Sequence, residues 1–299
     1  MDNLTHSLVG IASAKAGLEK LSPAVTTLCV LAANAPDADI VVLLFGDRWT
    51  LLQHHRGITH ALVGTLVFAL VLPAVFYLSD VLISRIRKQP RRLVFKGLLI
   101  SSLVVSATHP LLDWTNNYGI RFFLPWNARW FYGDLVFIVD PFIWLILGSA
   151  CFLLTTRTRF MWMVWSIVGL ILTLLIFLSA RAANLSHPWL IRSVWLIAIV
   201  SLTLLAWKGV AKRSGQRIAS GSLVAVVLYW GILGTAHSFA LARAKTESVA
   251  VAREGELISR IAAMPTLANP LSWDCVFETD KATYRFNLVL GDTQITNPV

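Results

Sequence analysis

Charged side chains are scarce in this sequence: Asp, Glu, Lys and Arg together make up only 14% of its 299 residues. Hydrophobic residues make up 56%, and the mean hydropathy is +0.67. Several apolar runs reach the roughly 17 to 25 residues that a bilayer-spanning helix needs. This composition is not that of a soluble globular protein, and it indicates an all-α polytopic membrane protein.

Cysteine is scarce as well, with three widely separated residues at Cys29, Cys151 and Cys275. Two of them lie in apolar runs, so we expect neither a disulfide framework nor a zinc site with thiolate ligands. The N-terminus also lacks the basic flank that a secretory signal peptide carries. We therefore expect the N-terminal segment to be retained.

Acidic residues are outnumbered, because 16 Asp and Glu stand against 26 Lys and Arg and give a net charge of +10. Such a balance can indicate a nucleic-acid partner. Here, however, the basic residues concentrate in short loops between apolar runs, where they report membrane orientation. We therefore expect membrane lipid as a partner and no nucleic acid.

Apolar segments suggest about eight transmembrane helices within residues 1–242, and no internal repeat stands out. The first segment is short and rich in small residues such as Gly10 and Ala12, which let a helix pack closely against its neighbours. The expected segments are about 4–19, 23–45, 58–79, 94–113, 135–154, 160–180, 188–207 and 222–242.

Basic loops predict the orientation, because cytoplasmic loops carry an excess of Lys and Arg. The basic loops here lie near residues 80–96, 155–159 and 208–217. With eight spans, both termini then lie outside the cytoplasm. The first five histidines and most aspartates of the membrane part fall on the same outer side, although they did not enter the assignment. This distribution predicts a metal site that opens to the periplasm or the cell exterior.

Asn34-Ala35-Pro36-Asp37-Ala38-Asp39 interrupts the second apolar segment. Pro36 lacks a backbone donor and can open the helix locally, and acidic residues at membrane depth usually have a function. A helix-capping role accounts for one of the two aspartates, but it does not easily account for both.

The densest histidine cluster is His54-His55-Arg56-Gly57-Ile58-Thr59-His60. Gly57 leaves the chain free to turn, so His55 or His54 could converge with His60. Such a cluster indicates a metal site, with a pH-sensing patch as the alternative. Nitrogen and oxygen ligands without thiolate suit zinc, and also manganese or iron.

His109 and Asp113 lie four positions apart and therefore share one face of a helix. They stand at the end of an apolar run, where no polar pair is required for a helix, and a polar stretch from Asn116 to Arg121 follows. Arg121 and Arg56 could grip a phosphate or carboxylate with their forked donors.

Three further residues carry open alternatives. His6, near the start of the first segment, could be a ligand or a hydrogen-bonded structural residue. Asp140, which precedes Pro141, is typical of a carboxylate at the start of a helix. Asp134 could do the same, or it could orient a histidine ligand.

These motifs, in this order over residues 1–180, resemble the YdjM/YbcI family of bacterial inner-membrane proteins, which are described as membrane-bound metal-dependent hydrolases. The residues that carry the resemblance are Thr5-His6, Pro36-Asp37-Ala38-Asp39, His55-Arg56-Gly57-Ile58-Thr59-His60, His109-Pro110-Leu111-Leu112-Asp113 and Tyr118-Gly119-Ile120-Arg121.

That family is in turn similar to a group of zinc-dependent phospholipases C and nucleases, whose metal ligands include a His-x-x-x-Asp pair with an Asp and a His before it. His109, Asp113, Asp37 and His60 match this pattern. No His-x-x-x-Glu follows in this chain, and the only later histidines are His187 and His237. The resemblance therefore implies two metal ions, with His6 and His55 completing the ligands.

The resemblance implies a phospholipase C-like hydrolase that cleaves a phosphoester of a lipid or lipid-linked substrate at the outer face of the inner membrane. The alternative is a transporter or a metal-handling protein without hydrolase activity. For the hydrolase, the implied ligands of two divalent ions, most simply zinc, are His6, Asp37, Asp39, His55, His60, His109 and Asp113. The implied catalytic residues are Asp39, as a possible base, with Arg121 and Arg56.

Residues 243–299 differ in character from the membrane part. We expect a charged amphipathic helix at 243–262, a linker at 264–270, and two strands at 271–277 and 282–290 joined by a polar turn. This small α+β appendage is too short for a large core of its own, and with the termini outside it would be extracytoplasmic. Nothing in the sequence indicates an oligomeric state.

Overall fold

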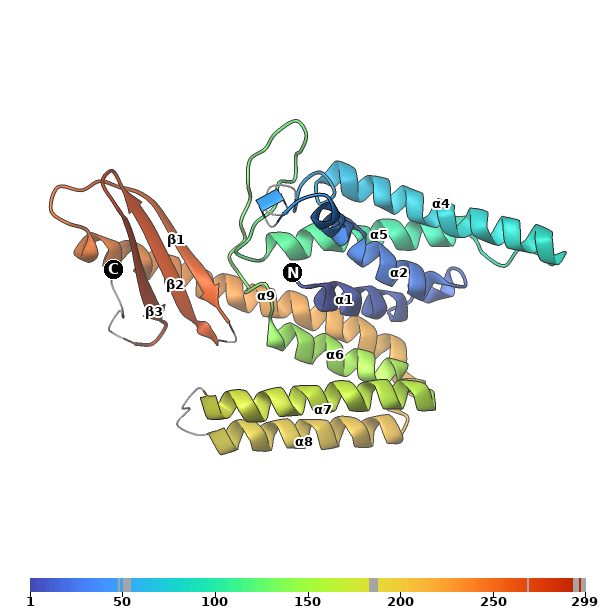
Figure 1. Cartoon of the computed structure of the whole chain (residues 1–299). Coiled ribbons are helices and arrows are strands. Elements are labelled where there is room, and N and C mark those ends of the chain that lie inside the picture. Colours follow the sequence, from blue (N-terminus) through green and yellow to red (C-terminus); the bar gives the residue numbers. More distant parts are fainter. Residues whose placement is uncertain (48, 51–54, 183–187, 268, 293–295, 297–299) are drawn as a thin grey trace.

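A bundle of helices is joined through one long helix to a small β-sheet in the computed structural model of the chain (Figure 1). The structure describes residues 1–299 except 48, 51–54, 183–187, 268, 293–295 and 297–299. The elements in chain order are α1 (Asn3–Lys15), η1 (Leu18–Lys20), α2 (Val25–Asn34), η2 (Ala35–Leu44), α4 (Leu62–Arg87), α5 (Phe95–Trp114), α6 (Pro141–Thr155), α7 (Arg159–Ala182), α8 (Pro188–Trp207), α9 (Val210–Val251), β1 (Ile258–Thr266), β2 (Asn269–Thr279) and β3 (Thr283–Val289).

Helix α1 lies in the middle of the bundle, in contact with α2, α5, α6 and α9. Small side chains permit this position. A Cβ atom added to Gly10 would lie 2.8 Å from the Cys29 carbonyl oxygen on α2, and Ala12 and Ala14 are fully buried. The close packing predicted for the first apolar segment is therefore present.

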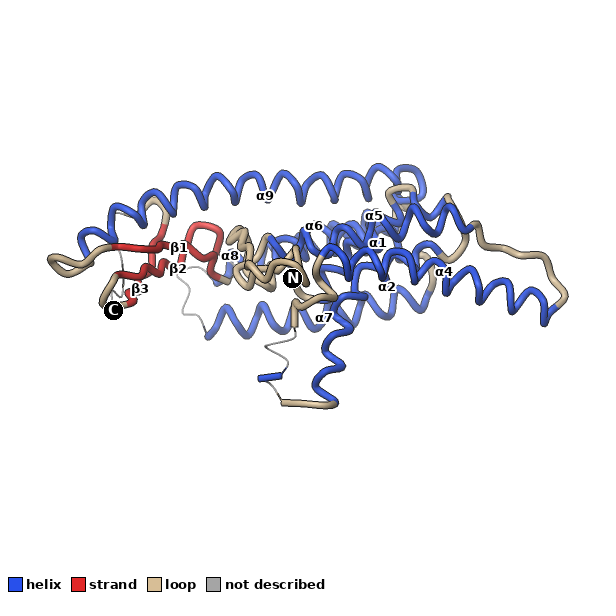
Figure 2. Tube along the Cα trace, turned by 90° about the horizontal axis from the view of Figure 1, so that it is seen from above, coloured by secondary structure: helices blue, strands red, loops and turns tan. Residues whose placement is uncertain are grey.

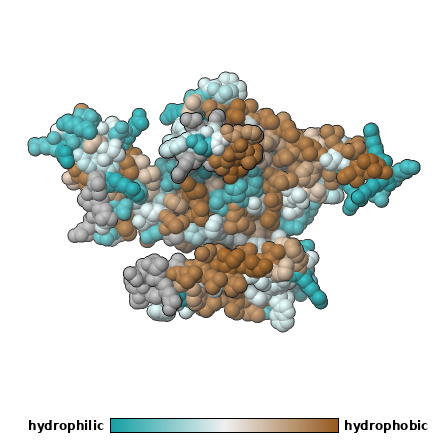
Figure 3. All heavy atoms as spheres, viewed as in Figure 1, coloured by the Kyte–Doolittle hydropathy of each residue, from teal (hydrophilic) through white to brown (hydrophobic). Residues whose placement is uncertain are grey.

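Five stretches are long and apolar enough to cross a membrane, judged by length and composition: Val25–Leu44, Leu62–Arg87, Phe95–Trp114, Arg159–Leu178 and Val210–Val251. The shorter apolar helices among the described residues are Pro141–Thr155 and Arg192–Trp207. Apolar side chains cover the visible faces of α4 and of the α7–α8 pair (Figure 3). The fold is therefore that of a mostly helical membrane protein, while the count of eight spans stays a prediction.

The second apolar segment is not one straight helix. Helix α2 ends at Asn34, and the chain continues as the 3-10 helix η2, which has Pro36 in its first turn. Seen from above, η2 leaves the bundle and runs across the direction of the long helices (Figure 2). The interruption predicted from Pro36 is therefore present.

One end of the bundle gathers the chain segments that matter for function. The N-terminus, the C-terminal end of α5 and the start of α6 lie at this end, which is also the end nearer the sheet (Figure 1). The connection between α4 and α5, which contains Arg91 and Arg92, lies at the opposite end.

Helix α9 carries the β-sheet. Ala240 and Ala244 near its C-terminal end pack against Trp273 and Phe286 of the sheet. The sheet is antiparallel with the order β1-β2-β3. The strands predicted at 271–277 and 282–290 correspond to β2 and β3.

The predictions for residues 252–270 were wrong, whereas residues 243–251 are helical as expected. Helix α9 ends at Val251 instead of continuing to 262, Gly255 turns the chain with a φ of 81°, and Ile258–Thr266 forms the strand β1. The expected linker is strand as well, since Pro265 pairs with Trp273. Proline is tolerated there because β1 is an edge strand, where a missing N–H need not cost a ladder hydrogen bond.

Candidate metal centre

Four separate segments bring histidine and aspartate side chains to the end of the bundle described above. His6 comes from α1, Asp37 and Asp39 from η2, His55 and His60 from the loop before α4, and His109 and Asp113 from α5. The structure places all seven predicted metal ligands in one region.

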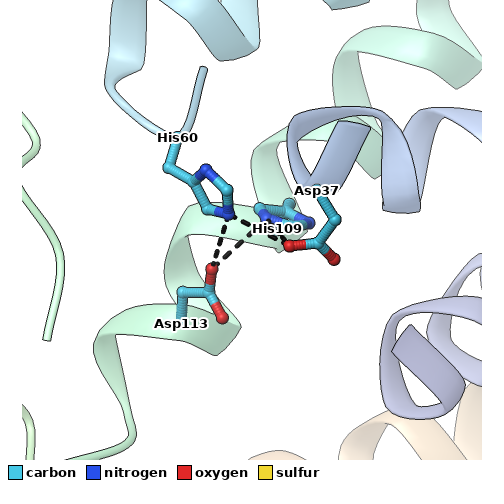
Figure 4. Close-up of side chains that lie close together, drawn as sticks. All are labelled: Asp37, His60, His109 and Asp113. Atoms are coloured by element: carbon cyan, nitrogen blue, oxygen red, sulfur yellow. Dashed lines mark hydrogen bonds and ion pairs between the residues drawn. The ribbon is translucent and has the colours of Figure 1, made fainter. Parts of the chain in front are cut away.

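Asp37, His60, His109 and Asp113 form what we call the inner group, whose donor atoms lie within 4.8 Å of one another. Nε2 of His60 lies 3.1 Å from Oδ1 of Asp37 and 3.5 Å from Oδ2 of Asp113. Nε2 of His109 lies 3.2 Å from the same Asp113 oxygen. The two rings and two carboxylates point toward a common centre (Figure 4), as metal ligands would.

The hydrogen bond behind His109 determines its tautomer. Nδ1 of His109 lies 2.7 Å from the Ala33 carbonyl oxygen, and a carbonyl oxygen can only accept, so Nδ1 carries the proton. Nε2 of a neutral His109 then presents a lone pair toward the oxygens of Asp37 and Asp113, and it has no hydrogen-bond partner among the described residues. Such a buried arrangement requires a proton or a cation between the groups.

His60 also belongs to a second group, the outer group, which it forms with Asp39 and His55. Nδ1 of His60 lies 3.3 Å from Oδ2 of Asp39, and Nδ1 of His55 lies 3.1 Å from Oδ1 of Asp39. One ring nitrogen of His60 therefore faces each group. The His55 side chain is 29% exposed, whereas His60 is fully buried, so the outer group lies closer to the protein surface.

Burial also favours the metal-binding form of His60. Removal from water lowers the pKa of its imidazole below the ordinary value of 6.5, because burial penalises the charged form. A neutral imidazole is the form that binds a metal ion. His60 is therefore available as a ligand at neutral pH.

His6 lies against the inner group. Its ring stacks on that of His109, with 4.0 Å between centroids, and its Nε2 lies 3.5 Å from Oδ1 of Asp113. Neither ring nitrogen of His6 has a hydrogen-bond partner among the described residues. A structural histidine normally has such partners when it is buried, so this geometry favours the interpretation of His6 as a ligand.

Arg56 is buried, and its guanidinium contacts groups of the protein. Nη2 lies 3.2 Å from Oδ1 of Asp113, and Nη1 donates to Oδ1 of Asn116 and to the Gly119 carbonyl oxygen, both 2.9 Å away. The guanidinium carbon lies 4.5 Å from the centre of the Tyr118 ring. These contacts position Asp113 and the polar stretch that follows it.

The chain bends at Gly57 as expected, but the residue with a left-handed backbone in this loop is Arg56. Arg56 has a φ of 55°, whereas Gly57 is not among the glycines with positive φ. The left-handed region is unfavourable for a residue with a side chain. The backbone N–H of Arg56 donates to Oδ2 of Asp39, and this bond, together with the guanidinium contacts, holds the turn.

The charges at the centre fit a divalent cation. Three carboxylates, those of Asp37, Asp39 and Asp113, stand against two positive groups, the Arg56 guanidinium and the Met1 amine, both of which pair with Asp113. An excess of buried negative charge is costly, and a cation would neutralise it. Imidazole nitrogens with carboxylate oxygens suit zinc, manganese or iron. The residues present therefore fit a metal ion.

Some other candidates have different surroundings. The Arg121 guanidinium lies over the Trp130 ring, 4.7 Å from its centre. Asp140 accepts hydrogen bonds from the first N–H groups of α6, in keeping with the prediction of a helix-start carboxylate. His54 and His187 lie outside the described residues.

Asp134 is a partly buried acid in the loop between α5 and α6. It adopts a φ of 50°. Burial raises the pKa of its carboxyl to about 6, because the charged form loses water. Both roles that the sequence suggests for Asp134, a helix-start carboxylate and a partner that orients a histidine ligand, stay predictions.

Two contributors to the site escape sequence reasoning. Ala33 contributes its backbone carbonyl oxygen, and because every residue has this group, the residue type gives no signal of the role. Trp144 on α6 donates its indole N–H to Asp2 and Thr5, and so holds the first turn of α1, where His6 lies. As one of 12 tryptophans, Trp144 does not stand out, although the Asp2–Thr5 spacing is a recognisable capping signal.

Comparison with known proteins gives two matches. A family model described as YdjM inner membrane protein matches residues 1–183. The chain is also 28% identical over 155 residues to a Bacillus subtilis (strain 168) protein named "Uncharacterized protein YfhP". That match covers 48% of this chain and 43% of the relative, which is less than half of either protein. No solved structure matches the chain significantly.

Proposed function

Because this chain belongs to the YdjM inner membrane protein family, we propose that the inner group is the metal centre of a membrane-bound hydrolase. Its substrate is a phosphoester of a lipid or of a lipid-linked molecule, cleaved in the manner of a phospholipase C. One observation carries the proposal, namely the buried lone pair of His109 Nε2, which faces Asp37 and Asp113 without a hydrogen-bond partner among the described residues.

Two zinc ions suit the two groups of ligands. The first would be held by the inner group with His6, and the second by Asp39 and His55. Because a neutral imidazole has only one lone-pair nitrogen, His60 would bind the first ion through Nε2 and donate its Nδ1–H to Asp39. A divalent ion supplies a Lewis acid for the phosphoryl oxygen and a water nucleophile at neutral pH. The nearness of the two groups supports this assignment, since they share His60.

The protein's own side chains would orient the substrate and move its protons. Asp39 lies beside His55 and His60 and accepts the backbone N–H of Arg56, where it can act as a base or orient His60. Arg56 keeps Asp113 in place. Arg121, on the same loop as Trp130, grips the phosphate with its forked donors.

The membrane arrangement of the proposal follows the basic loops. Eight spans would put both termini and the metal centre outside the cytoplasm, and the connection with Arg91 and Arg92 inside it. The placement of that connection at the opposite end of the bundle from the inner group supports this orientation. A centre at the outer interface can reach the headgroup of a lipid.

The metal content of the purified protein tests the proposal. We expect the wild-type chain in detergent to retain about two zinc ions, and His109→Ala with Asp113→Ala to lose at least the inner one. A matched control is His237→Ala. His237 belongs to neither group of metal ligands and contacts Trp273 of the sheet instead. Equal metal in the double variant and the wild type would defeat the ligand assignment.

Activity is tested on the same samples. Vesicles that contain phospholipid, and a soluble phosphodiester with a chromogenic leaving group, are offered to wild-type, double-variant and His237→Ala protein. We expect release of phosphorylated headgroup that a chelator stops and zinc restores, and that the double variant lacks. A metal-loaded wild type without activity on any phosphoester would favour a metal-handling role.

A further inference from the structure

Helix η2 has an outer side that the metal centre does not use. After Asp37 and Asp39, which face the histidines, the chain continues as Ile40-Val41-Val42-Leu43-Leu44-Phe45. Leu44 is 77% exposed and Phe45 is 87% exposed. An exposed apolar run of this kind marks an interaction surface, and we call residues 40–45 the apolar ridge.

Although Val25–Leu44 is long and apolar enough to cross a membrane, the direction of η2 argues that residues 35–44 do not extend α2 as one straight spanning helix. Helix α2 has 10 residues and is therefore about 15 Å long, half of the ~30 Å apolar thickness of a membrane. Beyond Asn34 the chain does not continue along the bundle but runs across it (Figure 2). The apolar ridge consequently extends sideways from the end of the bundle that holds the metal centre.

The surface around the apolar ridge identifies what covers it. Helix η2 contacts α4, and α4 exposes Leu62 and Leu66 in its first turns. These leucines belong to a candidate membrane span that must face lipid. No charged residue occurs from Ile40 to Phe45, so the ridge presents an uncharged apolar surface next to the lipid-facing surface of α4.

We propose that residues 40–45 lie in the membrane as an interfacial anchor, parallel to the bilayer plane, in the leaflet on the side of the metal centre. Such an element buries its apolar face at the boundary between headgroups and acyl chains. Because the same helix carries Asp37 and Asp39, the anchor holds these two aspartates at headgroup depth. This inference does not depend on metal binding or on hydrolysis.

Spin labelling of the full chain tests the anchor. The three native cysteines are buried and unpaired, so Phe45→Cys introduces an accessible thiol for a nitroxide. The labelled protein is placed in nanodiscs of phosphatidylethanolamine and phosphatidylglycerol, and collisions of the label with oxygen and with a water-soluble nickel chelate are measured. Oxygen concentrates among acyl chains, whereas the chelate stays in water.

We expect the label at position 45 to collide several-fold more with oxygen than with the chelate. The matched control is Leu257→Cys, at a position that is 75% exposed and lies before β1, where we expect the opposite order. Leu44→Cys repeats the test if Phe45→Cys does not fold. A label at both ridge positions that collides mainly with the chelate would show a water-facing ridge and overturn the proposal.

A label at position 45 that neither reagent reaches would also overturn it, because protein would then cover the ridge. Broadening between labels would identify that cover as a second copy of the chain. Zinc content measured on the same nanodiscs keeps the two proposals separate, since the anchor can be present in a protein without metal.

Discussion

Nδ1 of His60 lies 3.3 Å from Oδ2 of Asp39, while Nε2 of the same ring lies 3.1 Å from Oδ1 of Asp37. The two aspartates thus occupy different sides of one imidazole, although only one residue separates them in the sequence. A regular α-helix would turn them to different faces; here η2 places both on His60. Their substitutions should therefore have different consequences.

Asp39→Asn should remove one metal ion per chain and leave the other, because only the outer group loses its carboxylate. Asp37→Asn should weaken the inner ion instead. Metal analysis of both purified variants after dialysis against a weak chelator separates the effects. If Asp39→Asn keeps two ions with affinity reduced about 10- to 100-fold, then Asp39 merely orients His60.

Arg56→Met should destabilise the protein, because it leaves the buried carboxylate of Asp113 without its guanidinium partner. Breaking a buried ion pair costs about 3–5 kcal/mol, and added zinc should recover part of this loss. Thermal unfolding in detergent, with and without zinc, measures both effects. Arg129→Met is the control, since Arg129 is exposed over Phe131; equal losses in the two variants would contradict the role assigned to Arg56.

Gly10→Ala should disturb the packing of α1 on α2, because the added Cβ would lie 2.8 Å from the Cys29 carbonyl oxygen. Overpacking of this kind costs about 1–3 kcal/mol. Gly148→Ala on α6 adds a Cβ with nothing within 4 Å and should stabilise by about 0.4–1 kcal/mol. Melting temperatures that change in the same direction in both variants would refute this account of the helix contact.

Asp134→Asn should make stability less dependent on pH. Burial raises the pKa of Asp134 in the folded protein to about 6, from 3.8, so the folded state holds this proton more tightly than the unfolded state. The wild type therefore loses stability as the pH rises from about 4 to 6, and the full loss is present above pH 6.

Asparagine has no proton to lose, and it tolerates the positive φ at this position. At pH 7.5 the variant should be more stable than the wild type by roughly 1 kcal/mol, a value discounted for partial exposure. Near pH 4 the two should be equal. Unfolding curves at both pH values measure the difference, and a constant gap between the proteins would contradict the shifted pKa.

Residue patterns with a local cause were predictable from the sequence. His109 and Asp113 share a helical face because of their spacing, and Pro36 interrupts the second apolar segment because it lacks a backbone donor. Patterns of this type predicted which side chains gather, and the structure places those side chains together.

Features that depend on distant backbone were not predictable. The Ala33 carbonyl oxygen sets the His109 tautomer without any residue signal, and the sideways direction of η2 follows from packing against α4 and α2. The strand β1 was missed for a similar reason: Ile258–Thr266 pairs with β2, a contact with a later segment that the local residue pattern does not reveal.

Helix α9 is attached at one point to the helical bundle and at another to the β-sheet. Tyr229 donates a hydrogen bond to Asp140 at the start of α6, and Ala240 and Ala244 further along support the sheet. Each helical residue rotates the chain by about 100°. The number of residues between these points therefore sets the direction in which the sheet faces about the axis of α9. Removal of a single residue would rotate the sheet about the axis of α9 by about 100°. Removal of seven residues would nearly restore its direction and bring it about 10 Å closer to the helical bundle.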